Sequence, residues 1–255
     1  MTADGIMIRR VETQAEYEEC VRIQDETWGA GFSERVPSAI LKVSQYLGGV
    51  TAAAFDGAAA DARILGFVFG MTGIRDGQLV HWSDMLAVRP EARDHGIGRR
   101  LKLYQRSLVA ELGVTQILWT FDPLVSRNAH LNLNALGARV TDYVPDMYGA
   151  DTGSALHQGI GTDRFVVAWE VSGDVSGEAG KRGSGDGRRQ ERGTEVLVEI
   201  PQDIQQLIVA DPVAARKWRE STRSAFLRLL ADGYRVAGFE RSPAGGFYRL
   251  SRGSD

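Results

Sequence analysis

A glycine turn between a strand-like and a helix-like segment carries the clearest chemical pattern in this chain. Leu86-Ala87-Val88 precedes the turn, and Gly96 and Gly98 stand two residues apart where a helical pattern begins. Glycine lets a ligand approach the backbone where a Cβ would obstruct it, and the first N–H groups of a helix have no intrahelical acceptor. The helix dipole adds partial positive charge at the same point. The turn therefore predicts an anion-binding site.

Basic side chains crowd the same turn. Arg93, Arg99, Arg100 and Lys102 lie at the start of the helix, where each cation is disfavoured by a few tenths of a kcal/mol. A bound polyanion reverses that penalty. The alternatives are a plain strand-turn-helix with solvated arginines, and a Rossmann dinucleotide site. The latter needs a third glycine, an N-terminal position and an acidic residue about 20 positions further on, and the order of elements argues against it.

Composition narrows the class of protein that must hold this turn. The chain has 255 residues, of which 43% are hydrophobic and 25% charged, so it can bury a core and is not collagen-like, disordered or disulfide-stapled. With 30 Lys+Arg against 33 Asp+Glu, a surface built for nucleic acid is not expected. The single Cys20 and four scattered His predict no disulfide and no metal site. No apolar run reaches the ~20 residues of a membrane span and no export leader is visible, so we expect a cytoplasmic protein without membrane contact.

Periodicity and turn signals predict the elements around the turn. Thr13-Gln14-Ala15-Glu16 is a capping box that opens a helix carrying Tyr17, Val21 and Trp28. An apolar stripe of Ile97, Leu101, Tyr104, Leu108 and Leu112 predicts the helix after the turn, and a second stripe of Ala129, Leu133 and Leu136 predicts a helix capped by Ser126. A further helix is expected over 39–47. Strands are expected over 6–11, 50–55, 64–71, 80–88, 114–121, 139–144 and 164–171.

A glycine-rich, charged segment divides the chain. We expect a main domain over 1–171, a flexible linker over 172–193 and a C-terminal extension over 194–255 that packs on the main domain. The extension reads as a strand (195–200), a short helix, a long helix that begins at Asp211 and Pro212, and a hairpin over 234–250. Its helix carries Arg216, Lys217, Arg219, Arg223 and Arg228, which we expect on the outer face.

The residues of the turn resemble the acyl-CoA pyrophosphate loop of the GNAT acyltransferase superfamily. Arg93-x-x-Gly96-x-Gly98 follows Leu86-Ala87-Val88-x-Pro90, and the element order through residue 171 is similar to that fold. The resemblance implies an α/β (α+β) fold with a GNAT-like mixed sheet flanked by helices, followed by a small α+β extension. Further segments resemble a GNAT subgroup with a C-terminal extension, which includes amino-acid N-acyltransferases and N-succinyltransferases. These segments are Trp119-Thr120-Phe121-Asp122-Pro123-Leu124, Arg127-Asn128-Ala129-x-x-Asn132, Leu136-Gly137-Ala138, Tyr148-Gly149 and Asp163-Arg164-Phe165.

The same resemblance implies site residues, with acetyl-CoA or another acyl-CoA as co-substrate and no metal. Residues implied to bind the co-substrate are Leu86, Val88, Arg93, Asp94, His95, Gly96, Ile97, Gly98, Arg99, Asn128 and Asn132. Residues implied to bind the acceptor are Ser83, Arg127 and Arg164. Residues implied in catalysis are Asp84, Tyr148 and Asp122.

An acyl transfer to an amine needs a group that takes a proton from the amine. Two-residue alternation on the 80–88 strand puts Trp82, Asp84, Leu86 and Val88 on one face, with Asp84 the only ionisable group among them. Desolvation beside Trp82 suits this carboxylate to act as a base. The alternative is a hydrogen-bonded structural aspartate.

The departing thiolate needs a proton in turn. Many GNAT members carry a tyrosine four residues before the helix-ending glycine, but here that position is Leu133. Tyr143 and Tyr148 are the candidate replacements, and protonation by solvent is the alternative. Asn128 and Asn132, one helical turn apart, predict contacts to pantetheine or substrate, or else ordinary capping.

Other polar residues follow the fifth strand. Asp122 is expected to cap the next turn or to orient the acceptor amine. Arg127, Arg164 and Lys102 are candidates for a carboxylate on the acceptor or acyl chain, or are solvated charges.

Three functions remain open from the sequence. The first is an N-acyltransferase that moves an acetyl- or succinyl-type group from acyl-CoA to a small amine, such as an amino acid, by direct attack. The second is a non-catalytic acyl-CoA-binding module, and the third is a protein N-acetyltransferase. The sequence leaves the acyl group, the acceptor, its chirality and a homodimeric state undetermined.

Overall fold

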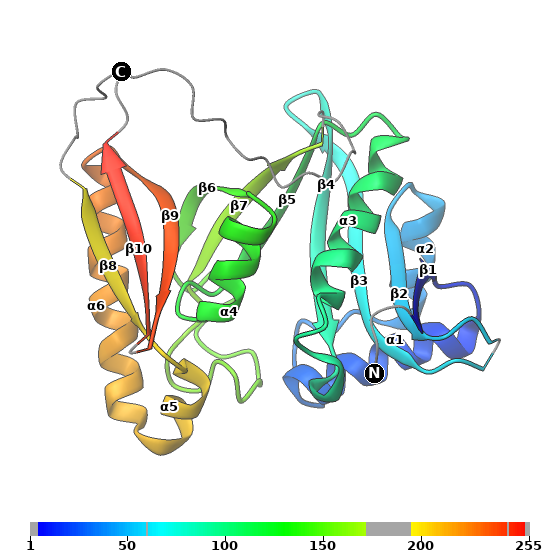
Figure 1. The fold of residues 1–255 in the computed structure, drawn as a ribbon, viewed down its shortest axis with the longest axis horizontal. Helices are drawn as coiled ribbons and strands as arrows, with labels where there is room; N and C mark the ends of the chain where they lie inside the picture. Colours follow the sequence, from blue (N-terminus) through cyan, green and yellow to red (C-terminus); the bar gives the residue numbers. More distant parts are fainter. Residues whose placement is uncertain (1–4, 60, 172–194, 244, 253–255) are drawn as a thin grey trace. The chain divides into compact units, whose positions relative to one another are not determined.

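The computed structural model describes residues 5–59, 61–171, 195–243 and 245–252 (Figure 1). Within them the strands form a seven-stranded sheet in the order β1-β2-β3-β4-β5-β7-β6 and a three-stranded sheet in the order β8-β10-β9. This mixed α/β architecture is the one expected. The predicted 172–193 linker lies outside the described residues. No helix in the described ranges is both long and apolar enough to span a bilayer.

The bounds of the elements are close to those predicted. The strands are β1 (Ile6–Arg10), β2 (Val50–Asp56), β3 (Ile64–Arg75), β4 (Gln78–Val88), β5 (Gln116–Phe121), β6 (Arg139–Val144), β7 (Arg164–Glu170), β8 (Val196–Pro201), β9 (Tyr234–Ser242) and β10 (Gly245–Arg252). The helices are α1 (Gln14–Trp28), α2 (Ser38–Tyr46), α3 (Ile97–Ala110), α4 (Ser126–Ala129), α5 (Ile204–Ala210) and α6 (Pro212–Ala231).

Local side-chain chemistry explains several of these boundaries. Both hydrogen bonds of the predicted capping box form between Thr13 and Glu16 at the start of α1. The β3–β4 hairpin turns on Asp76 and Gly77, both with positive φ, which suits the twist of a two-residue turn. The Asp211 carboxylate accepts the N–H of Ala214 at the start of α6, as its N-cap position predicts.

The first of two compact units contains residues up to Thr120 together with Asp151–Gln158 and part of β7. Its sheet carries α1 and α2 on one face and α3 on the other (Figure 1). The core between the sheet and α1 and α2 includes Phe55, Phe67 and Phe69, all fully buried.

A β-bulge interrupts β4 beside the predicted site. Phe69 on β3 pairs with Met85, whereas the next residue, Gly70, pairs with Ser83, so Asp84 is the extra residue. Met85 belongs to the core under α1 and α2, whereas Ser83 hydrogen-bonds to a side chain on α3. The single-face prediction for Trp82, Asp84, Leu86 and Val88 is therefore wrong, because an extra residue reverses the alternation.

The parallel pairing of β4 with β5 is short. It comprises Val80–Gln116, His81–Ile117 and Trp82–Leu118, and it stops at the residue before Ser83. We call the region just beyond the Trp82–Leu118 pair the β4–β5 fork.

Helix α3 is rotated from its predicted orientation. Its buried residues are Ile97, Leu101, Lys102, Gln105 and Val109, whereas Leu112 follows the helix and is 46% exposed. The prediction used apolar residues only. Because Lys102 and Gln105 are buried, the buried face of α3 is shifted by about one residue from the predicted stripe.

The second unit combines Phe121–Ala150, Gly159–Val167 and the described part of the C-terminal segment. Its division from the first unit differs from the boundary predicted at residue 171. An aromatic cluster explains why, since Phe165 on β7 contacts Phe226 on α6 at 4.7 Å and Tyr248 on β10 at 5.3 Å between ring centroids. The described part of the C-terminal segment thus shares one core with residues 121–150 and 159–167.

The helix after β5 differs from the predicted one. The α-helical part α4 begins after Val125, not Ser126, and a π-helical turn, His130–Ala135, continues it. Leu136 donates its N–H to the carbonyl of Leu131, five residues earlier. This wider turn changes the spacing on which the predicted Ala129-Leu133-Leu136 stripe depends, and Leu133 is only half-buried.

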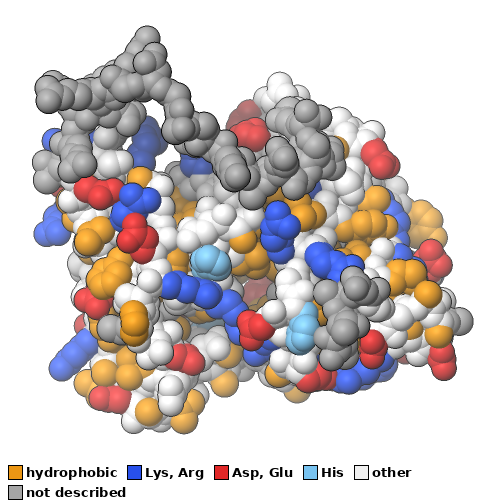
Figure 2. Space-filling model, in the orientation of Figure 1, with side chains coloured by type: hydrophobic (Ala, Val, Ile, Leu, Met, Phe, Trp, Pro, Cys, Tyr) orange, Lys and Arg blue, Asp and Glu red, His pale blue; other side chains and the backbone are white. Residues whose placement is uncertain are grey.

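Charges of both signs are dispersed over the visible face of the molecule (Figure 2), as the formal net charge of −3 suggests. Among the described residues visible on this face, no large single-sign patch occurs.

Candidate functional site

The predicted anion-binding turn links β4 to α3. A short 3-10 turn, Pro90–Ala92, follows β4, and Asp94 and Gly96 then adopt positive φ values of 65° and 70°. Gly96 is the N-cap of α3, so the N–H groups of Ile97 and Gly98 open the helix. A Cβ on Gly96 would meet no atom within 4 Å, so packing does not require glycine there. The left-handed backbone favours it, and its open side suits a ligand.

The basic residues near the turn differ in their surroundings. Arg89 is buried and ion-paired with Glu19 and Glu26 on α1, so its charge is already balanced. Arg93 Nε donates to the Val88 carbonyl at 3.1 Å, and Arg100 Nη2 donates to the Ile6 carbonyl at 2.7 Å. These bonds hold the loop and the start of α3 against the sheet.

Asp84 projects from the bulge on β4. Trp82 Nε1 donates to its Oδ1 at 3.2 Å. Water reaches this exposed carboxylate, yet surrounding protein displaces part of its hydration and raises its pKa, against the lowering effect of the Trp82 bond. A carboxyl with a raised pKa is a better proton acceptor, as expected for a base.

Ser83 lies on the α3 side of β4, where sequence reasoning missed a partner. Lys102 Nζ donates to Ser83 Oγ at 2.7 Å and lies 3.8 Å from the centre of the Trp119 ring. Burial lowers the pKa of Lys102 well below its ordinary value. The sequence shows only a lysine in the first turns of a helix, and such a lysine is usually solvated. Nothing in the sequence therefore indicates its contact with Ser83.

A second buried polar group lies next to Lys102. His81 is fully buried between Thr72 Oγ1, 2.9 Å from Nδ1, and Gln105 Nε2, 3.0 Å from Nε2. Burial, with the nearby charge of Lys102, lowers the pKa of His81 to about 3. This imidazole is therefore neutral at physiological pH.

In the second unit, Asp122 lies at the end of β5 in a buried charge cluster. Arg219 Nη2 on α6 donates to its Oδ2 at 2.6 Å, and Arg164 Nη1 lies 3.9 Å from the same oxygen. Its Oδ1 accepts the Leu124 N–H, so it caps the turn after β5 as predicted. Burial favours the neutral acid, but Arg219 and Arg164 outweigh this and lower the pKa of Asp122. The predicted outer-face position of Arg219 is wrong, since its side chain is 2% exposed.

Asp163 forms the neighbouring cluster. It accepts hydrogen bonds from Tyr143 and from Arg223, which also pairs with Asp146. Despite burial, Arg223 and Tyr143 lower the pKa of Asp163. The Tyr143 proton is thus committed to a carboxylate, and burial raises the pKa of Tyr143. Tyr148 is only half-buried, with Arg164 Cζ 5.4 Å from its ring centre.

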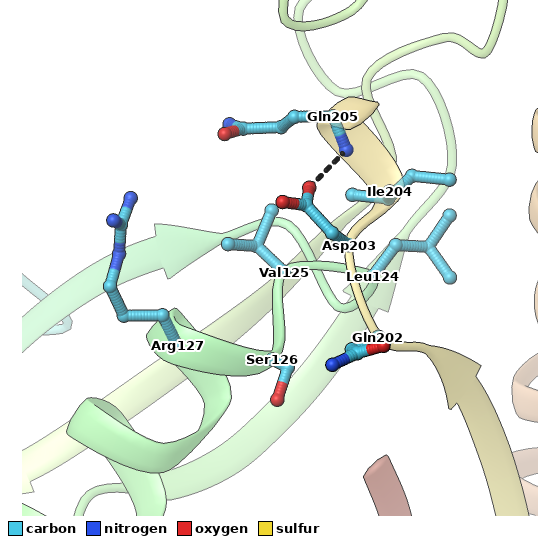
Figure 3. Close-up of a pocket in the computed structure, with 8 residues that line it drawn as sticks. All are labelled: Leu124, Val125, Ser126, Arg127, Gln202, Asp203, Ile204 and Gln205. Carbon is cyan, nitrogen blue, oxygen red and sulfur yellow. Dashed lines mark hydrogen bonds between the residues drawn. The ribbon is translucent and has the colours of Figure 1, made fainter. Parts of the chain in front are cut away.

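Residues at the start of α4 line a small pocket of about 110 Å³ (Figure 3). Leu124, Val125, Ser126 and Arg127 form one wall, and Gln202, Asp203, Ile204 and Gln205 form the other. Arg127 is exposed. Asn128 is half-buried, whereas Asn132 is buried and its carbonyl accepts the N–H of Ala138 at 2.9 Å.

The predicted site residues fall into the two units. The first unit holds Ser83, Asp84, Leu86, Val88, Arg93, Asp94, His95, Gly96, Ile97, Gly98 and Arg99. The second unit holds Asp122, Arg127, Asn128, Asn132, Tyr148 and Arg164. No group of three or more His, Cys, Asp or Glu side chains with metal-binding geometry occurs in the described ranges.

No family model matches the chain, and neither does any curated protein sequence. Solved structures do. A chain of the NatC complex bound to Gag peptide and CoA matches with a TM-score of 0.51 at 18% identity, over 65% of this chain and 98% of that one. The yncA structure from Salmonella typhimurium with acetyl-CoA matches with a TM-score of 0.51 at 16% identity, over 69% and 99%.

Aminoglycoside 6′-acetyltransferase type Ii matches with a TM-score of 0.50 at 16% identity, over 66% of this chain and 99% of that one. Each of these chains is covered almost completely, while about a third of the present chain has no counterpart in it. The protein therefore has the fold of GNAT acetyltransferases.

Proposed function

We propose that the protein is an acyl-CoA-dependent N-acyltransferase that acts on the amine of a small acceptor. The observation that carries this proposal is the left-handed N-cap at Gly96, which opens α3 directly after a bulged strand that separates from β5. This loop presents backbone N–H groups to a pyrophosphate, and the β4–β5 fork supplies a place for the pantetheine arm and thioester. Both features fit acyl-CoA. Proteins of the same fold with CoA or acetyl-CoA bound support this assignment.

In this proposal, loop residues 93–99 hold the diphosphate, and Leu86 and Val88 border the pantetheine. Asp84 is exposed and accepts a hydrogen bond from Trp82, and we assign its carboxylate to take a proton from the attacking amine. Attack of the amine nitrogen on the thioester carbonyl forms the amide, and the C–S bond breaks to release CoA thiolate. Tyr148 is the side chain we assign as proton donor to that thiolate, since Tyr143 is committed to Asp163.

The charged residues of the second unit receive different tasks. A carboxylate held ionised between two guanidinium groups is a poor proton carrier, so we assign Asp122 to positioning Arg164. Arg127 is exposed and can meet a carboxylate without breaking an ion pair. An amino acid as acceptor and a succinyl-type donor both offer such a carboxylate. Asn128 and Asn132 are assigned to the pantetheine arm.

Thiol release tests the proposal. Acetyl-CoA and succinyl-CoA are each offered with free amino acids of both chiralities, with an aminoglycoside and with an N-terminal peptide. We expect release of CoA with a free amino acid. Release only with the peptide would favour a protein N-acetyltransferase, and tight acyl-CoA binding without release would favour the non-catalytic module.

A further inference from the structure

Lys102 lies at the β4–β5 fork, although it belongs to α3. Its amine contacts Ser83 on β4 and Trp119 on β5, which are the residues immediately after the last pair, Trp82–Leu118. The side chain is 2% exposed. One lysine therefore contacts both strands just where their pairing ends.

Stability alone does not account for this lysine. Burying an ammonium costs free energy unless an opposite charge and hydrogen bonds compensate it. The described residues give Lys102 the Ser83 hydroxyl and the Trp119 ring but no ion pair. Neighbouring His81 does not need it, because Thr72 and Gln105 satisfy both ring nitrogens. Methionine would fill similar space without a polar atom.

Ser83 is the only side-chain hydrogen-bond partner of this amine among the described residues. Its Oγ accepts from Lys102, and it donates no hydrogen bond within the same part of the chain. A serine hydroxyl carries one proton and can donate it while accepting another bond. The bond from Lys102 fixes the oxygen, so the hydroxyl proton remains available to a group that enters the fork.

We propose that Lys102 is a positioning residue that holds the Ser83 hydroxyl at the β4–β5 fork, where it donates to the acyl group of acyl-CoA. The inference rests on the proposed function, which places the thioester in this fork. Lys102 itself does not touch the acyl group. Its effect passes through Ser83.

Binding measurements test this independently of turnover. CoA and acetyl-CoA differ by the acyl group, so the ratio of their Kd values reports the Ser83 contact. We expect Lys102→Met and Ser83→Ala each to lower the preference for acetyl-CoA about three- to tenfold, the worth of one hydrogen bond, while the Kd for CoA stays within twofold. Lys42→Met, on the exposed side of α2, is the matched control and should change neither value.

The double variant separates a path through Ser83 from two independent effects. Lys102→Met combined with Ser83→Ala should lose no more preference, and no more kcat, than either single variant. Urea unfolding should show Lys102→Met at least as stable as the wild type.

Several outcomes would overturn the inference. These are an unchanged acetyl-CoA preference in Lys102→Met, additive losses in the double variant, or a destabilised Lys102→Met that weakens CoA and acetyl-CoA equally. If the wild type binds acetyl-CoA with a Ser83-dependent preference but transfers no acyl group, the proposed function fails and this inference stands. If it binds neither molecule, both fail.

Discussion

Replacing Arg219 with methionine removes the partner of a buried carboxylate and should destabilise the second unit strongly. Arg219 Nη2 donates to Asp122 Oδ2 at 2.6 Å, with the two side chains 2% and 9% exposed, and its Nε donates to the Ile160 carbonyl at 3.1 Å. Breaking a buried pair costs about 3–5 kcal/mol because one charge is left uncompensated. Arg164, 3.9 Å from the same oxygen, offsets part of this. We therefore expect the lower end, a loss of about 3 kcal/mol in the free energy of unfolding.

Urea unfolding followed by circular dichroism, with calorimetry as a second probe, measures this loss. Arg216→Met is the matched control, since Arg216 is exposed on the same helix and should change stability by about 0.5 kcal/mol or less. Adding Asp122→Asn to Arg219→Met removes the stranded charge, and the asparagine oxygen can still accept the Leu124 N–H. The double variant should recover at least about 1 kcal/mol.

A free energy of unfolding for Arg219→Met within about 1 kcal/mol of the wild type would contradict this prediction, as would a double variant that loses the sum of both single losses. Either result would mean that water or a rearranged Arg164 stabilises the charge of Asp122 as strongly as Arg219 does.

Three further predictions concern the first unit and the pH dependence. Gly98→Val should weaken acyl-CoA binding at least tenfold, about 1.4 kcal/mol, by calorimetry, with an unchanged melting temperature; unchanged affinity in the folded variant would exclude the loop as the site. Asp84→Asn should lower kcat about 100-fold at neutral pH, with little effect on acyl-CoA affinity and a smaller loss at high pH, whereas near-native kcat would make Asp84 structural. Burial lowers the pKa of Lys102, so between the folded pKa and the ordinary value of 10.5 the unfolded chain binds the extra proton. Wild-type stability in urea should therefore rise with pH through that window, by at most about 1.4 kcal/mol per pH unit from this group, and Lys102→Met should lack this contribution.

Local signals in the sequence predicted much of the fold. The Thr13 capping box and the Asp211 N-cap each depend on residues within a few positions, and each formed as predicted. The loop at Gly96 belongs to the same class, because a left-handed glycine and a helix start are encoded by neighbouring residues.

Contacts between distant segments escaped the same reasoning. The bulge at Asp84 depends on the register between β3 and β4. Alternation along β4 alone therefore placed Trp82, Leu86 and Val88 on one face of the sheet, although the bulge puts Trp82 on the opposite face from the other two. Lys102 was predicted to bind a carboxylate or to be a solvated charge, and Arg219 was placed on the outer face of its helix. Nothing near them in the sequence shows that Ser83 and Asp122 are their partners. Hydropathy describes a residue type, whereas burial of a charge is decided by a partner elsewhere in the chain.

The position of α6 near the C-terminus also constrains when the second unit can fold during synthesis. Asp122 and Asp163 leave the ribosome well before Arg219 and Arg223, which pair with them, have been added. At about 5–20 residues per second, the nascent chain carries these carboxylates for about 3–20 s without their guanidinium partners. The buried ion pairs of the second unit can therefore form only after its C-terminal helix emerges, so its native core forms late.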